Sequence, residues 1–143
     1  MTDMGEMHQC VRQLGNVLRP LLHAYVARLR AAHPEMQIDQ YEGPVGESTE
    51  YQGYQIGIDC TVPGSGDLDT PTSLALEVSV KRASTMPEID AADVAWGHPS
   101  GYVEAALLDE AAQLSERAIQ DLVAGLPRLL DAMDAALVRG RPR

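Results

Sequence analysis

The chain has 143 residues, 45% of them hydrophobic, and a formal net charge of −10. This length is typical of one folded domain, so residues 1–143 are interpreted as a single domain with a frayed tail over residues 139–143. An acidic chain repels nucleic-acid phosphates, and no apolar stretch approaches the roughly 20 residues that a spanning helix needs. Nucleic acid and membrane are therefore excluded as expected partners.

The acidic residues are concentrated in the middle of the chain. Residues 35–110 hold fifteen of the 21 Asp and Glu residues but only two of the 11 basic residues, Lys81 and Arg82, which gives this segment a net charge of −13. The remaining basic residues lie in the terminal segments, on the polar faces of the expected helices. The charge is thus a property of the central region rather than of the whole surface.

The first element is predicted to be an amphipathic helix. Apolar residues recur every three or four positions over residues 4–29, which is typical of one buried helix face. Asp3 and Glu6 match the spacing of a capping box at its start. Pro20 removes a backbone donor, so a kink or a restart is expected there, and His33-Pro34 should end the helix.

Four strands are expected next, over residues 36–42, 54–62, 74–81 and 92–96. In the second and third, apolar residues alternate with polar or small ones, which is typical of an antiparallel sheet with one buried face. The segment from Pro63 to Pro71 is rich in Gly, Ser, Asp and Pro, so it predicts a long turn between these two strands.

The rest of the chain is predicted to be helical. An apolar stripe of helical spacing starts at Val103 and continues to Leu137. Gly125 and Pro127 interrupt the backbone but not the phase of the stripe, which favours one long kinked helix over two helices.

These elements define an α+β fold in the order α-β-β-β-β-α. The simplest packing is a two-layer sandwich, in which the N-terminal helix and the long C-terminal helix cover one face of a four-stranded antiparallel meander. The other face is expected to be polar and open.

One string carries candidate chemistry. His98 and Glu104 are candidate catalytic residues, and Trp96, His98, Ser100 and Tyr102 are candidate ligand-binding residues at the expected strand-to-helix junction. The alternative is that Gly97 and Pro99 turn the chain and that Ser100 or Gly101 caps the helix.

Metal and cofactor chemistry are not expected. Two acids in the loop 64–69 lack the further ligands of a calcium loop, and the four histidines are scattered along the sequence. Cys10 and Cys60 fall on apolar faces, so they are interpreted as buried free thiols in a cytoplasmic protein.

The expected open face carries Asp59, Glu77 and Asp93 as candidate partner-binding residues. Asp59 and Glu77 could form an acid–base pair, or they could be solvated carboxylates on adjacent strands.

The acidic field favours a non-catalytic interaction module, of chaperone, adaptor or immunity type, that binds a basic or partly unfolded protein. A homodimer through helices or an edge strand is a further hypothesis. The alternative function is a small-ligand-binding protein or enzyme with its site around His98.

Overall fold

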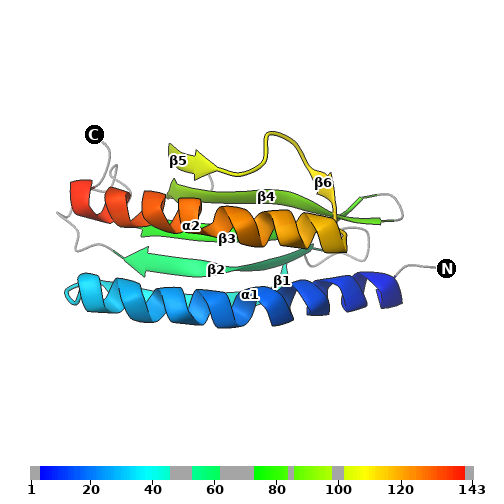
Figure 1. Cartoon of the computed structure of the whole chain (residues 1–143), viewed down its shortest axis with the longest axis horizontal. Coiled ribbons are helices and arrows are strands. Elements are labelled where there is room, and N and C mark those ends of the chain that lie inside the picture. Colours follow the sequence, from blue (N-terminus) through cyan, green and yellow to red (C-terminus); the bar gives the residue numbers. More distant parts are fainter. Residues whose placement is uncertain (1–3, 46–52, 62–72, 84–85, 98–101, 141–143) are drawn as a thin grey trace.

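The computed structural model describes residues 4–45, 53–61, 73–83, 86–97 and 102–140. Helix α1 (Met4–Ala32) precedes strands β1 (Gln37–Val45), β2 (Gly53–Thr61), β3 (Ser73–Ala83), β4 (Met86–Trp96), β5 (Tyr102–Ala106) and β6 (Ala112–Gln113), and helix α2 (Glu116–Arg139) ends the described chain (Figure 1). The α+β fold and the helix–sheet–helix order predicted from the sequence are confirmed.

The sheet is antiparallel throughout, with strand order β1-β2-β3-β4-β5, and β6 pairs with the other end of β4. Apolar positions are in register across neighbouring strands, as in the row Ile58, Leu76 and Val94. The register shifts between Ser79 and Val80 and again between Val94 and Ala95, where bulges interrupt the ladders.

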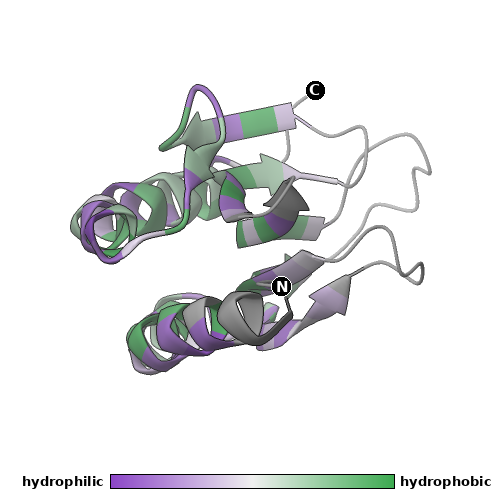
Figure 2. Ribbon diagram, turned by 90° about the vertical axis from the view of Figure 1, so that its right-hand side faces the viewer, coloured by the Kyte–Doolittle hydropathy of each residue, from purple (hydrophilic) through white to green (hydrophobic). Residues whose placement is uncertain are grey.

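Both helices lie on the same face of this sheet and run in the same direction (Figures 1 and 2). Helix α1 packs mainly on β1 and β2, whereas α2 packs on β3, β4 and β5. Among the residues whose burial is described, the core between the two layers is aliphatic apart from Trp96, Cys60 of the sheet and Met133 of α2. Its fully or nearly fully buried members include Leu14, Leu18, Leu22, Ile56, Ile58, Cys60, Leu76, Val78, Val94, Trp96, Leu126, Leu129 and Met133.

Helix α1 continues as one helix through Pro20, so the chain does not restart there. It ends at Ala32, immediately before His33-Pro34, as predicted. The imidazole of His33, 7% exposed, lies 2.8 Å from an Asp134 carboxylate oxygen and so joins the end of α1 to α2. The N-terminal cap expected at Asp3 lies outside the described residues.

The predicted start of the C-terminal helix at Val103 is wrong. Residues 102–106 form β5, in which Val103 is paired with Ala95 of β4, and α2 begins only at Glu116. Ser115 caps α2 by accepting a hydrogen bond from the backbone N–H of Ala118 at 3.1 Å. In the described part of the chain the sheet therefore has six strands, where four were expected. Pairing with β4 outweighed the helical spacing of the apolar residues in this segment.

From Glu116 onward the prediction of a single helix is confirmed, because α2 continues through Gly125 and Pro127 to Arg139. Gly140 follows with φ of 94°, a conformation that favours glycine, and its N–H bonds to the carbonyl of Ala136. Neither described helix combines the length and the hydropathy needed to cross a lipid bilayer.

Candidate functional site

The face of the sheet opposite the helices is polar and acidic. Strand alternation turns Asp39, Asp59, Glu77 and Asp93 toward this side, one from each of four neighbouring strands. We call these four carboxylates the acidic face. Both described helices lie on the other side of the sheet, so neither of them covers it (Figure 2).

The centre of the acidic face is a tyrosine laid across a glycine. Tyr41 of β1 is paired with Gly57 of β2, which in turn is paired with Glu77 of β3. The hydroxyl of Tyr41 donates a hydrogen bond to Glu77 Oε1 at 2.7 Å. A Cβ at position 57 would lie 2.9 Å from the Tyr41 hydroxyl oxygen, so only glycine leaves room for this contact. Burial, and then the bond to Glu77, raise the pKa of the Tyr41 hydroxyl well above its usual value.

The carboxylates differ in their partners. Glu77 and Asp93 stand directly opposite each other on β3 and β4, where facing side chains lie about 5 Å apart. Asp59 accepts a hydrogen bond from the Ser73 hydroxyl at 3.0 Å. Asp39 forms an ion pair with Arg30 at 3.3 Å in which both side chains are 57% exposed, so solvent screens this pair.

Asp59 and Glu77, which the sequence suggested as neighbours on adjacent strands, do lie near each other. Asp59 is paired with Ala75, and Glu77 follows two positions along β3, so the two acids are diagonal neighbours on the same face. Such an arrangement concentrates negative charge and can bind cationic side chains. Among the described residues, no three His, Cys, Asp or Glu side chains are placed so that they could hold a metal ion.

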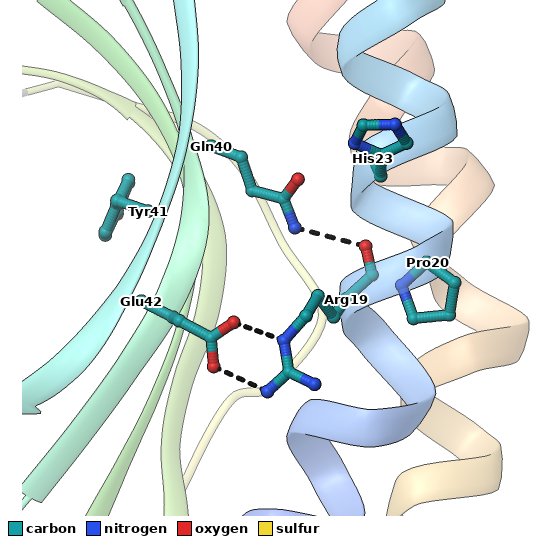
Figure 3. A pocket seen from close by; sticks show the side chains of 6 residues that line it. All are labelled: Arg19, Pro20, His23, Gln40, Tyr41 and Glu42. Atoms are coloured by element: carbon teal, nitrogen blue, oxygen red, sulfur yellow. Dashed lines mark hydrogen bonds and ion pairs between the residues drawn. The ribbon is translucent and has the colours of Figure 1, made fainter.

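The other side of β1 carries an ion pair that fastens the first helix. Arg19 of α1 donates to both oxygens of Glu42, with Nε–Oε1 and Nη2–Oε2 distances of 2.5 and 2.8 Å (Figure 3). The Tyr54 hydroxyl also donates to Glu42. The bond from Arg19 lowers the pKa of Glu42 to about 2, whereas burial followed by the bond to Glu42 raises the pKa of Tyr54 to about 12.

A shallow hollow of about 570 Å³ lies beside this ion pair and includes His23 and Gln40 in its lining. Gln40 donates to the carbonyl of Arg19 at 3.1 Å, while the side chain of Tyr41 points away to the opposite side of the strand (Figure 3). The charged groups drawn there are paired with each other. We therefore interpret the hollow as part of the contact between α1 and β1 rather than as a ligand site.

The residues predicted around His98 lie at a different kind of junction. Residues 97–101 join β4 to β5, two strands, and not a strand to a helix as expected. Trp96 is fully buried and its indole N–H donates to Glu104 Oε1 at 2.8 Å, and Arg139 donates to the same oxygen. These bonds give Glu104 a structural role in joining β4, β5 and α2.

Of the other members of that candidate site, only Tyr102 is described, and it is paired with Trp96 across β4 and β5. Tyr102 is 58% exposed at the start of the edge strand β5. His98 and Ser100 lie outside the described residues, so chemistry at His98 stays a prediction. The loop 64–69 and the side chain of Cys10 also lie outside them. Cys60 is a buried free thiol, and burial raises its pKa to about 12, which suppresses thiolate reactivity.

Two features of the surface were missed from the sequence. Tyr41 belongs to the strand with the weakest alternation, and only the register reveals that it reaches Glu77. An apolar cavity of about 250 Å³ lies between the segment that follows β5 and the first half of α2. It was missed because that segment was interpreted as helix.

Comparison of the chain with protein-family models, with curated proteins and with solved structures found no match.

Proposed function

We propose that this protein is a non-catalytic interaction module whose acidic face binds a basic segment of a partner protein. The observation that carries the proposal is the presence of carboxylates from four neighbouring strands on the side of the sheet that neither described helix covers. Ala75, which is paired with Asp59 and lies two positions before Glu77, is small and leaves room for an extended segment to approach these two carboxylates.

The charge balance of this face supports a cationic partner. Lys81 lies on the same face, and its ammonium group forms an ion pair with Asp90 at 3.3 Å. The surrounding segment carries a net charge of −13, so its field extends beyond individual pairs. Such a field accelerates association with a basic partner. Salt screens the field, which at physiological ionic strength is largely lost beyond a Debye length of about 8 Å.

The test compares two pairs of charge-removing substitutions. A fluorescein-labelled peptide of alternating Lys and Ala is titrated with wild-type protein at low and at physiological salt, and fluorescence anisotropy gives the Kd. The face variant Glu77→Gln/Asp93→Asn should weaken binding about tenfold, the equivalent of roughly 1.4 kcal/mol. The control Glu116→Gln/Asp131→Asn changes the net charge equally at exposed positions of α2 and should change the Kd less than twofold.

The outcomes separate a local surface from a diffuse charge effect. If both double variants weaken binding equally, only net charge matters and the assignment to the acidic face is wrong. If binding of the peptide does not weaken with salt, the electrostatic basis is wrong. A partner purified from host cells supports the proposal only if the face variant fails to retain it and the control retains it.

A further inference from the structure

The apolar cavity beside α2 is the second surface feature that a partner could use. The segment from Leu107 to Gln113 forms an arch, fixed at one end by the bond from the Leu107 N–H to the Ala92 carbonyl at 2.9 Å. Its other end is fixed by β6 and by the bond from the Leu114 N–H to the Pro87 carbonyl, also 2.9 Å. The cavity is therefore built by backbone pairing rather than by loose loop packing.

The lining of this cavity is mostly apolar. Leu107, Leu108 and Ala112 contribute from the arch, Ile89 from β4, and Ala118, Leu122 and Gly125 from α2. Gly125 leaves room for the Leu107 side chain, because a Cβ there would lie 2.8 Å from the end of that side chain. A volume of about 250 Å³ is below the range of roughly 300–1,000 Å³ for small-molecule sites. It suits a single anchoring side chain of a protein partner, the usual centre of a binding hot spot.

Three acidic residues and one arginine lie in or beside the cavity. Asp121 lines it, and the arch carries Asp109 and Glu110 at exposed positions. Arg128 also lines it, and its guanidinium donates to the Ala106 carbonyl at 3.3 Å. A partner segment with an apolar anchor and flanking basic residues would therefore complement these charges better than a neutral or acidic segment would.

The cavity lies on the helix side of the sheet and the acidic face on the other side, and both reach the edge strand β5. Asp93 is paired with Ala106 of the edge strand β5, and the next residue, Leu107, lines the cavity. Three to five extended residues span roughly 10–16 Å, enough to pass around this edge. One short segment can thus contact both surfaces.

We propose that the cavity between the arch and α2 holds an apolar side chain, such as leucine, of the same basic segment that binds the acidic face. This proposal rests on the proposed function and adds a sequence requirement for the partner: a large apolar residue about three to five positions from its basic residues.

The experiment uses three labelled nine-residue peptides and the full chain. The first has a leucine four residues from a pair of lysines in an alanine background, the second has alanine in place of the leucine, and the third has glutamates in place of the lysines. The first peptide should bind about tenfold more tightly than the second, as expected for burial of a leucine side chain. The third should bind more weakly than either.

Two substitutions on the same helix then locate the anchor. Ala118→Leu places an extra side chain in the cavity and should reduce the affinity for the leucine peptide to that for the alanine peptide. Ala124→Leu makes the same change at an exposed position and should leave the preference for leucine intact. If Ala118→Leu does not fold, Gly125→Ala, which displaces Leu107 toward the cavity, replaces it.

Several results would overturn the inference. Equal binding of the leucine and alanine peptides to wild-type protein would show that no anchor is used, and so would a leucine preference that survives Ala118→Leu. Occupation of the cavity by 1-hexanol, without any leucine preference, would make it a small-molecule cavity. If the face variant weakens both lysine peptides equally while the leucine preference is absent, only this inference fails. If neither lysine peptide binds wild-type protein, both proposals fail.

Discussion

At the scale of single residues, Gly57 has little freedom to change. Its missing side chain makes room for Tyr41, and an added Cβ would also lie 2.1 Å from the backbone carbonyl oxygen of Leu76. That second neighbour is backbone in the middle of the sheet, so it cannot move without disturbing the ladder. The bond from Tyr41 to Glu77 and the local geometry of β2 and β3 therefore depend on one glycine.

We expect Gly57→Ala to lower the free energy of unfolding by about 2–3 kcal/mol, the upper part of the range for overpacking in a well-packed site. Urea denaturation followed by circular dichroism measures this change. Gly43→Ala is the matched control. Gly43 lies on β1 and on the same face of the sheet as Gly57, but a Cβ there would meet nothing within 4 Å. A Gly57→Ala protein as stable as Gly43→Ala would contradict the close approach.

The residue scale also shows what the sequence cannot determine. Strand alternation placed Asp59, Glu77 and Asp93 on one face, and the structure agrees with that placement. Alternation does not fix register, however, so it could not show that Glu77 faces Asp93 or that Tyr41 crosses Gly57 to reach Glu77. These contacts depend on how far each strand slides against its neighbour.

At the scale of elements, the segment before α2 shows how two periodicities compete. Val103, Leu107 and Ala111 have helical spacing, and this spacing predicted a helix from Val103 onward. In the structure Ser115 supplies the cap, while the residues before it pair with β4 as β5 and β6. The signal in the sequence was Ser115 itself, a favoured N-cap residue just before the apolar stripe of α2.

This assignment of the helix start can be tested at the cap. Ser115→Ala removes the acceptor of the Ala118 N–H, so we expect a loss of about 1 kcal/mol in the free energy of unfolding. Ser115→Asp keeps an acceptor at the same position and should retain most of the stability. Thermal unfolding by calorimetry measures both variants. If Ser115→Ala and Ser115→Asp unfold at the same temperature as wild type, the side chain does not cap α2.

At the scale of the whole molecule, stability should respond to alkaline pH. Burial raises the pKa of Tyr54 to about 12 from 10.0 and that of Cys60 to about 12 from 9.0, and it raises the pKa of Tyr41 further. At a pH between the unfolded and the folded pKa of each group, the unfolded chain has released a proton that the folded chain keeps. Because the unfolded state then binds fewer protons, the free energy of unfolding falls as pH rises.

The stabilising contribution of these groups is fully present below about pH 9 and is lost progressively as pH rises toward 12. We expect urea denaturation at pH 8, 9, 10 and 11 to show this decline. Tyr41→Phe should flatten the decline between pH 10 and 11, because phenylalanine has no proton to lose. At pH 8 the free energy of unfolding of this variant should be about 1 kcal/mol lower than that of wild type, because the variant lacks the hydrogen bond to Glu77.

The control is Tyr102→Phe, since Tyr102 is 58% exposed and removal of its hydroxyl should leave the alkaline decline as in wild type. Absorbance of tyrosinate at alkaline pH provides an independent measurement, because Tyr41 should ionise only together with loss of the native circular dichroism signal. A Tyr41→Phe protein with the wild-type dependence on pH would show that the Tyr41 hydroxyl is not held in its protonated form by the fold. It would also contradict the hydrogen bond from Tyr41 to Glu77 at the centre of the acidic face.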